Sequence, residues 1–203
     1  IVLFDRVSHE IKTHNVVVDN FKGAYEATEH LLNMGYKNIA AIANSEFLSI
    51  TTERLAGYKE ALSQHNIKYN PAYVKHCFYG GMIFSEIEEA VNKLFTLKQK
   101  PDALITTSDK LTTGCLKTLL RSGIKVPKDI ALVGFSNSDL AELLNPPLTV
   151  VRQPAMEMGR AATELLLQFI ESKRPVTQFE NRVLTPELIL GNSSVLQQKE
   201  TIK

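Results

Sequence analysis

The chain has 203 residues, of which 44% are hydrophobic and 22% charged, and its 23 basic side chains nearly balance its 22 acidic ones. This composition is typical of a folded globular protein and excludes a disordered, collagen-like or coiled-coil chain. A net charge of +1 is low for a surface that binds duplex DNA. No apolar run approaches the ~18 residues that a membrane helix needs, so we expect no membrane partner.

Two features of the whole chain bear on where the protein works. Its two cysteines, Cys77 and Cys115, are too few for a disulfide framework, which favours a reducing compartment. The chain starts with Ile, inside an apolar run, and carries no signal-peptide pattern. We therefore expect a cytoplasmic protein whose N-terminus has been removed.

Short apolar runs alternate with helical segments up to Pro147. The predicted strands cover residues 16–18, 39–43, 73–78, 103–107 and 130–135. After each strand, apolar residues recur at three- and four-residue steps, which predicts an amphipathic helix. Because the strands are apolar nearly throughout and alternate with helices, the pattern predicts a doubly wound parallel sheet with helices on both faces.

The pattern changes after Pro147. A short strand is expected over 148–152 and a long helix over 156–170. Pro186 interrupts the last apolar run, 182–190, which predicts an edge strand or a broken pair of strands. The final residues, 195–203, have the composition of a frayed polar end.

In parallel sheets of this kind, ligands bind beyond the carboxyl ends of the strands. Polar pairs stand at these ends at 5–6, 19–20, 44–45, 108–109 and 136–137. Helix capping explains any one pair, whereas their recurrence favours a shared cleft. The sequence has no G-x-S-x-G, P-loop or G-x-G-x-x-G motif and no histidine at metal-ligand spacing. We therefore expect no enzyme, no metal and no cofactor.

Three motifs in order resemble the effector-binding core of the LacI/GalR family of bacterial transcription regulators. They are R-L-A-G at 54–57, V-P-K-D-I-A-L-V-G-F at 126–135 and L-T-V-V-R-Q-P at 148–154. The resemblance runs from residue 1 to about residue 194. It implies an α/β, periplasmic-binding-protein-like fold with doubly wound parallel sheets in two subdomains, of which the N-terminal one is largely missing.

The same resemblance implies a function. A small-molecule effector, a sugar or related metabolite, would bind in the cleft between the subdomains and control operator binding allosterically in a homodimer. DNA would be contacted only through an N-terminal helix-turn-helix that is absent from this chain. The alternative is the periplasmic sugar-binding protein of a transporter, which shares the fold.

The resemblance also divides the chain. Residues 1–15 would be a remnant of the N-terminal subdomain and a crossover, and residues 16–146 the C-terminal, effector-binding subdomain. Residues 147–178 would hold a second crossover and a helix of the N-terminal subdomain. Residues 179–203 would be the return strands and tail of the C-terminal subdomain.

Effector contacts follow from the resemblance as well, at Asp5, Arg6, Asp19, Leu48, Ile50, Arg54, Phe78, Tyr79, Ser108, Asp109 and Ser136. Arg54 matches the arginine that grips a hydroxyl or carboxylate of the ligand, and Tyr79 or Phe78 matches an aromatic that stacks on its ring. Leu48 and Ile50 stand where members often place polar contacts, and Ser136 stands where many place an aspartate. A smaller, more apolar or phosphorylated effector is therefore an alternative.

The dimer surface is predicted from an excess of apolar side chains. Met82, Ile83, Phe84 and Ile87 add more of them than one helix stripe needs to cover its own sheet. Because family members pair side by side, a two-fold axis would place this patch on both chains. The alternative is that residues 82–84 close the edge of the cleft.

Overall fold

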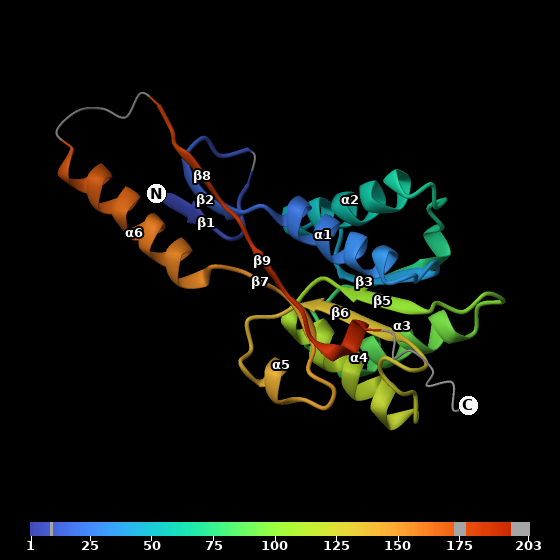
Figure 1. The fold of residues 1–203 in the computed structure, drawn as a ribbon. Helices are drawn as coiled ribbons and strands as arrows, with labels where there is room; N and C mark the ends of the chain where they lie inside the picture. Colours follow the sequence, from blue (N-terminus) through green and yellow to red (C-terminus); the bar gives the residue numbers. More distant parts are fainter. Residues whose placement is uncertain (9, 173–177, 196–203) are drawn as a thin grey trace.

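The computed structural model describes residues 1–8, 10–172 and 178–195. The chain forms a larger and a smaller body joined by three crossing segments (Figure 1). The larger body is built on a six-stranded sheet in the order β4-β3-β5-β6-β7-β9, and the smaller body on a three-stranded sheet in the order β1-β2-β8. The predicted α/β architecture with two sheets is thereby confirmed.

The sheet of the larger body is parallel except at one edge. Its parallel strands are β3 (Ile39–Asn44), β4 (Val74–Cys77), β5 (Ala103–Thr106), β6 (Ala131–Phe135) and β7 (Thr149–Arg152), and β9 (Glu187–Ile189) runs antiparallel to β7. The helices of this body are α1 (Asn20–Asn33), α2 (Ser49–Gln64), α3 (Phe84–Phe95), α4 (Asp109–Arg121) and the short α5 (Leu140–Leu143). Two 3-10 turns, Pro71–Tyr73 and Asn192–Ser194, complete it.

Helices cover both faces of the larger sheet, α1 and α2 on one face and α3 and α4 on the other (Figure 1). Every residue of β3, β5 and β6 is buried. Successive side chains of a strand point to opposite faces. Accordingly, Ile39 and Ala41 pack in the core beneath α1 and α2, whereas Ala40 and Ile42 pack in the core beneath α3 and α4. The predicted doubly wound arrangement is confirmed.

The close contact of α1 with α2 depends on a glycine of the R-L-A-G motif. A Cβ atom built on Gly57 would lie 2.2 Å from the backbone carbonyl oxygen of Phe21. Only a residue without a side chain allows the two helices to approach so closely. The motif thus combines Arg54, which reaches the cleft described below, with the packing of the two helices that hold it.

The smaller body has β1 (Val2–Phe4), β2 (His14–Val18) and β8 (Asn181–Leu184), all parallel, with α6 (Ala155–Glu171) packed against β1 and β2. Its buried core is small. It consists of Val16, Val18, Met158 and Leu165. The remaining apolar side chains of α6 are largely exposed, as for Met156 and Ile170.

The chain crosses between the bodies at 18–20, 152–155 and 184–187. These positions correct the predicted division of the chain. The strand over residues 16–18, expected in the larger body, pairs with β1 and β8 in the smaller one. The return strands split, because β8 joins the smaller sheet and β9 the larger. Pro186 lies between them, as the broken strand pair predicted, and the predicted polar end beyond residue 195 lies outside the described residues.

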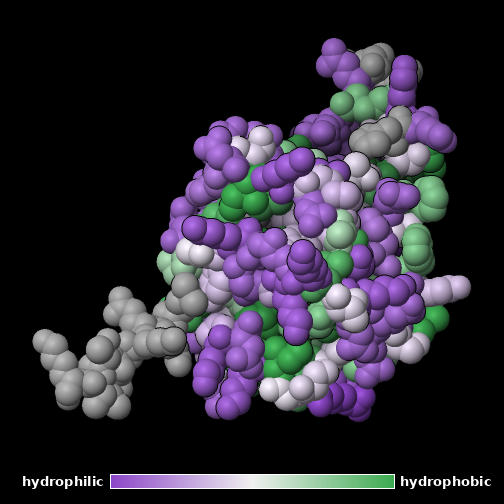
Figure 2. Space-filling view, turned by 90° about the vertical axis from the view of Figure 1, so that its right-hand side faces the viewer, coloured by the Kyte–Doolittle hydropathy of each residue, from purple (hydrophilic) through white to green (hydrophobic). Residues whose placement is uncertain are grey.

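Figure 2 shows the side of the molecule that lies on the right in Figure 1. This face is mainly hydrophilic, and its apolar side chains form small separate patches. Among the residues that the structure describes, no helix combines the length and apolarity required to cross a bilayer.

Candidate functional site

A cavity of about 590 Å³ lies at the carboxyl ends of the strands, where the two bodies meet. Both bodies contribute side chains to it. Its lining is Phe4, Asp5, Arg6, Asn44, Ile50, Arg54, Ser108, Asp109, Phe135, Ser136, Asn137, Ser138, Gln153, Ala155 and Met158. The structure thus brings seven predicted effector contacts into one cleft, namely Asp5, Arg6, Ile50, Arg54, Ser108, Asp109 and Ser136.

Arg54 is the most buried charge of the cleft, with 3% of its surface exposed. Its guanidinium donates from Nε to Asn20 Oδ1 at 2.9 Å, from Nη1 to the carbonyl oxygen of Thr107 at 2.6 Å and from Nη2 to Gln153 Oε1 at 2.9 Å. The guanidinium carbon also lies 3.8 Å from the centre of the Phe135 ring. Because a guanidinium has five N–H donors, each terminal nitrogen keeps one N–H that no described residue accepts.

Burial lowers the pKa of Arg54 to about 10, while the nearby carboxylates of Asp5 and Glu53 raise it in part. Glu53 also accepts a hydrogen bond from Asn20 Nδ2 at 2.8 Å. The Asn20 side chain therefore bridges the Glu53 carboxylate and the Arg54 guanidinium. At neutral pH the guanidinium is therefore charged, fixed in position and able to donate into the cleft.

Two polar atoms of the cleft residues have no hydrogen-bond partner among the residues that the structure describes. Asn44 Oδ1, at the last residue of β3, and Ser108 Oγ, after β5, are buried without a hydrogen bond to any described residue. A buried polar atom without a partner costs about 1–3 kcal/mol. Both residues line the cavity.

Asp5 enters the cleft from the smaller body through an unusual backbone conformation. Its φ of 61° lies in the left-handed region, which is unfavourable for a residue with a side chain. A hydrogen bond from its backbone N–H to the carbonyl oxygen of Val16, 3.0 Å long, holds this turn at the end of β1. Strained residues of this kind cluster at ligand sites.

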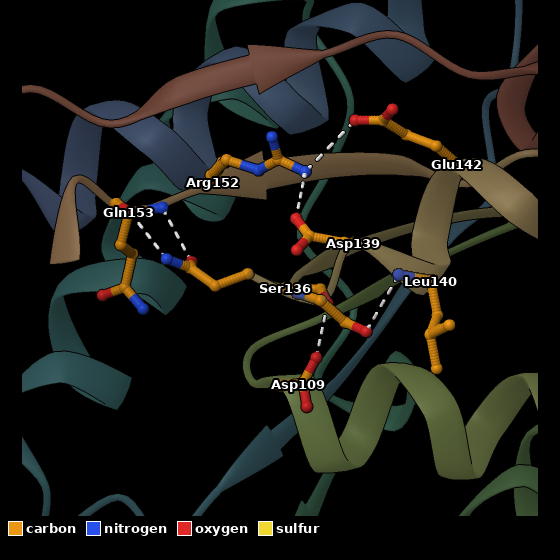
Figure 3. A network of polar contacts seen from close by, with 9 residues as sticks. Asp109, Ser136, Asp139, Leu140, Glu142, Arg152 and Gln153 are labelled. Atoms are coloured by element: carbon orange, nitrogen blue, oxygen red, sulfur yellow. Dashed lines mark hydrogen bonds and ion pairs between the residues drawn. The ribbon is translucent and has the colours of Figure 1, made fainter. Parts of the chain in front are cut away.

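A polar network after β6 forms another part of the cleft wall (Figure 3). Ser136 Oγ donates to Asp109 Oδ1 at the start of α4. Asn137 and Gln153 exchange two hydrogen bonds, from Asn137 Nδ2 to the Gln153 carbonyl oxygen at 2.7 Å and from the Gln153 N–H to Asn137 Oδ1 at 2.9 Å. Gln153 therefore connects this wall to Arg54 across the crossing segment between β7 and α6.

Four predicted contacts are not brought into the cavity. Asp19 instead caps α1 by accepting from the backbone N–H of Lys22, and Leu48 is the residue before α2. Phe78 and Tyr79 lie beyond β4 with 62% and 65% of their surface exposed, and their backbone N–H groups donate to Glu86. The reason is local in each case, because these residues lie at a helix start or in the turn that precedes one.

The sequence reading omitted several lining residues from its set of contacts. Asn44 ends β3 and Asn137 follows β6, and both were singled out only as strand-end polar residues. Gln153 follows β7 and was not singled out. Applying the strand-end rule to every strand would have included all three. Phe135, Phe4 and Met158 carry no such signal, because their apolar side chains look like core residues in a sequence.

Burial removes one residue from the predicted dimer surface. Ile87 is 1% exposed and belongs to the core beneath α3, so it is not available to a second chain. Met82 and Ile83 are exposed, and the Phe84 ring is partly covered by Lys117 and Arg121. In the described part of the chain, no group of three or more His, Cys, Asp or Glu side chains is arranged to hold a metal ion.

Comparison with known proteins identifies the family. Residues 28–194 match the family described as periplasmic binding protein-like domain, and the chain belongs to this family. Among curated proteins it is 33% identical over 193 residues to the HTH-type transcriptional repressor CytR of Escherichia coli, a match that covers 95% of this chain and 55% of CytR. The chain thus spans about half the length of the curated relatives it matches.

Solved structures agree with this assignment. The transcriptional regulator CelR in complex with cellobiose superposes with a TM-score of 0.85 at 31% identity, over 95% of this chain and 58% of that one. A sugar-binding transcriptional regulator of the LacI family from Escherichia coli, complexed with phosphate, gives a TM-score of 0.82 at 26% identity, over 97% and 69%. The resemblance to the core of LacI-type regulators is confirmed, and it is favoured over the transporter alternative.

Proposed function

We propose that this chain is the effector-sensing core of a LacI-type transcriptional regulator and that the cleft between its two bodies binds an uncharged polyhydroxylated ligand, a sugar or close derivative. One observation carries the proposal. Arg54 is fixed by three protein acceptors yet keeps donors for the cleft, beside two buried polar atoms without partners in the described residues.

The chemistry of the lining supports a neutral ligand. Two arginines, Arg6 and Arg54, are matched by two aspartates, Asp5 and Asp109, so the cleft has no excess charge to hold a phosphate. Planar amide, carboxylate and guanidinium groups suit hydroxyl groups that donate and accept at once. The cellobiose bound by CelR is a ligand of this kind. The phosphorylated effector left open by the sequence is less well supported by this balance.

Calorimetry on the full chain with a panel of sugars, including cellobiose and ribose, tests the proposal. We expect Arg54→Ala to weaken binding by about 1.5–3 kcal/mol, the order lost with a hydrogen bond to a charged group. Arg121→Ala, which removes an exposed arginine of the larger body, serves as the matched control. Unchanged affinity in a folded Arg54→Ala protein would remove this residue from the site.

The regulatory half of the proposal concerns DNA. We propose that operator DNA is bound by a helix-turn-helix outside these 203 residues, as in relatives named HTH-type repressors, and that the protein therefore works in the cytoplasm. Ligand binding would shift the angle between the two bodies, for which the three crossing segments are the hinge. A gel shift that gives sequence-specific, salt-resistant binding by residues 1–203 alone would contradict this division of labour.

We also propose that the protein works as a homodimer. Met82 and Ile83 remain exposed beside α3, as a surface for a second chain would require. Phe84→Glu is expected to shift the sedimentation of the protein toward that of a monomer at micromolar concentration.

A further inference from the structure

The amino ends of four neighbouring parallel strands, β4, β3, β5 and β6, form one side of the larger body, which we call the amino-end surface. The cleft lies at the carboxyl ends of the same strands, so the two sites are at opposite ends of the sheet. The amino-end surface is on the right in Figure 1 and faces the viewer in Figure 2. Four connecting segments form it, over residues 34–38, 65–73, 96–102 and 122–130.

These four segments hold a strong excess of positive charge. They contain two carboxylates, Asp102 and Asp129, and six lysines, which are Lys37, Lys68, Lys98, Lys100, Lys125 and Lys128. Taking these away from the 23 basic and 22 acidic residues of the chain leaves 17 basic and 20 acidic residues elsewhere. The nearly neutral chain is therefore divided into a basic amino-end surface and a remainder in which acidic residues are in excess.

The lysines of this surface are free, whereas its carboxylates are engaged. All six lysines are exposed, and none forms an ion pair with a described residue. Asp102 accepts hydrogen bonds from the backbone N–H groups of Lys37, at 3.1 Å, and Asn38, at 2.9 Å. Asp129 accepts from the backbone N–H of Lys125 at 2.8 Å. The carboxylates thus hold the backbone of the segments, and the ammonium groups remain available to a partner.

The helix dipoles do not account for these lysines. A cation stabilises a helix when it lies in the last turn, and the effect falls off beyond that turn. The last turns of α1, α3 and α4 already hold His30, Lys93 and Arg121, and that of α2 holds no basic residue. The six lysines follow the helices, in the connecting segments. Because grouped like charges repel one another, their presence indicates a binding surface.

A groove of about 600 Å³ opens on this surface, and we call it the lysine groove. Its lining is Asn70, Tyr73, Leu97, Lys98 and Gln99. It shares Asn70, Tyr73 and Gln99 with a smaller cavity of about 120 Å³ that reaches Lys37 and Lys68. Tyr73 is buried and Leu97 half-buried, so they form an apolar floor between polar side chains. Neither lining contains a carboxylate.

The groove has the groups that an extended acidic chain requires. Neighbouring strands lie about 4.8 Å apart, so the amino ends of four strands span about 15 Å, which about five extended residues cover. Asn70 uses its amide oxygen and Gln99 its amide nitrogen within the protein. The Asn70 NH₂ group and the Gln99 oxygen are left for the backbone of such a chain. Its carboxylates would pair with the lysines, and an apolar side chain would rest on Leu97.

Nucleic acid fits this surface less well. Proteins that bind single strands stack the bases on exposed aromatic rings. Here Tyr36 and Tyr73 are only 5% and 7% exposed, and Lys59 Nζ lies over the Tyr69 ring, 4.8 Å from its centre. The four segments contain no arginine, the side chain that most often reads bases in a duplex. A second copy of this chain would have to dock head to tail, because the surface has no free acidic groups to match its own lysines.

We propose that the lysine groove docks an extended acidic segment of another protein. This interaction goes beyond ligand sensing and does not depend on it, because the groove and the cleft lie at opposite ends of the sheet. The partner would therefore dock on the larger body whether or not a ligand occupies the cleft.

Fluorescence anisotropy on the full chain tests the chemistry of the partner. The labelled peptide alternates glutamate with serine and has one central leucine. At low ionic strength we expect it to bind, and to bind more weakly as salt is added, because exposed charge pairs are screened. The same peptide with glutamine in place of glutamate is expected to bind at least tenfold more weakly. A wild-type chain that does not prefer the glutamate peptide refutes the proposal.

Charge reversal tests the location. Lys98→Glu, in the lysine groove, is expected to raise the dissociation constant of the glutamate peptide at least fivefold, and Lys68→Glu repeats the test in the smaller cavity. Lys110→Glu, at an exposed position of α4 near its start, changes the net charge equally and is the matched control, expected to stay within twofold. Circular dichroism checks that the variants are folded. Equal losses for Lys98→Glu and Lys110→Glu would mean unspecific attraction and overturn the groove.

Two further measurements distinguish other occupants. Duplex DNA that displaces the peptide at a lower concentration of charge than the peptide itself would replace the acidic segment by nucleic acid. Self-association in sedimentation velocity that Lys98→Glu abolishes would replace it by a second copy. Calorimetry with sugars reports on the cleft and is expected to be unchanged by Lys98→Glu, so failure of the docking proposal and failure of the proposed function are seen in separate experiments.

Discussion

The two bodies of the molecule both line the cleft, but they differ in how extensively the structure behind each wall is buried. In the larger body, the central strands are buried over their whole length between two layers of helices. In the smaller body, three short strands share a core of only four buried apolar residues with one helix. One wall of the cleft is therefore rigid, and the other is free to adapt, which suits a site that closes on a ligand.

The residues of the cleft follow the same division. Arg54, Ser108 and Asp109 stand on helices and strand ends of the larger sheet, whereas Asp5 and Arg6 follow a short edge strand of the smaller one. The larger body positions the polar groups before any ligand arrives. The smaller body brings its pair of charges to them.

Truncating one buried leucine in each core tests the difference in rigidity between the two bodies, and it has the largest expected effect on the free energy of unfolding. Leu132→Ala in β6 is expected to lower the free energy of unfolding by about 2–5 kcal/mol, because its surroundings cannot collapse into the gap. Leu165→Ala in α6, buried to a similar degree, is expected to cost less than about 2 kcal/mol, since the smaller core can close over the gap. Urea denaturation measures both, and equal costs would refute the contrast.

Two glycines in helices, one in each body, provide a second comparison of the packing of the two bodies. Gly57→Ala places a Cβ 2.2 Å from a backbone oxygen of α1, so a loss of about 1–3 kcal/mol is expected from overpacking. Gly159→Ala in α6 meets no atom within 4 Å and is expected to stabilise its helix by about 0.5–1 kcal/mol. Thermal denaturation of the two variants should therefore shift in opposite directions.

The two cysteines lie in the core of the larger body, so their reaction with an alkylating reagent reports on that body alone. Burial raises the pKa of the Cys77 thiol to about 12 and that of Cys115 well above its usual value of 9.0. At pH 9 about one Cys77 thiol in a thousand is ionised, so alkylation of the native protein should be very slow. This raised pKa adds stability that is complete below pH 9 and is lost as the pH rises toward 12.

Alkylation then separates the two bodies. Leu132→Ala should speed the labelling of both cysteines, which lie in the core of the larger body, and Leu165→Ala should leave it unchanged. Equal acceleration by the two variants would mean that the bodies unfold as one unit.

Sequence patterns predicted the elements more closely than their assignment to bodies. Apolar periodicity located α1 to α4 and α6, and Pro186 marked the break between β8 and β9. The placement of residues 16–18 was wrong, because a strand of three valines looks the same whichever sheet it joins. Only pairing with distant residues, here β1 and β8, distinguishes the two.

The cleft shows a similar limit. Strand-end polar residues such as Ser108 and Asp109 were predicted because parallel strands end at one edge of a sheet. Phe78 and Tyr79 were expected in the cleft from the resemblance, yet the turn held by Glu86 keeps them outside it. The direction of such a turn depends on a side-chain contact eight residues along the chain, which a family pattern does not record.

The three crossings between the bodies limit how parts of the protein can be exchanged, both in engineering and by recombination between genes. Neither body is a continuous stretch of the chain, since the smaller one is assembled from residues near 1–18, 155–171 and 181–184. A single recombination point between two related genes would therefore divide a body instead of exchanging it. Grafting the ligand wall of one regulator onto another requires three junctions in register, so point substitution in the cleft is the shorter route to a new specificity.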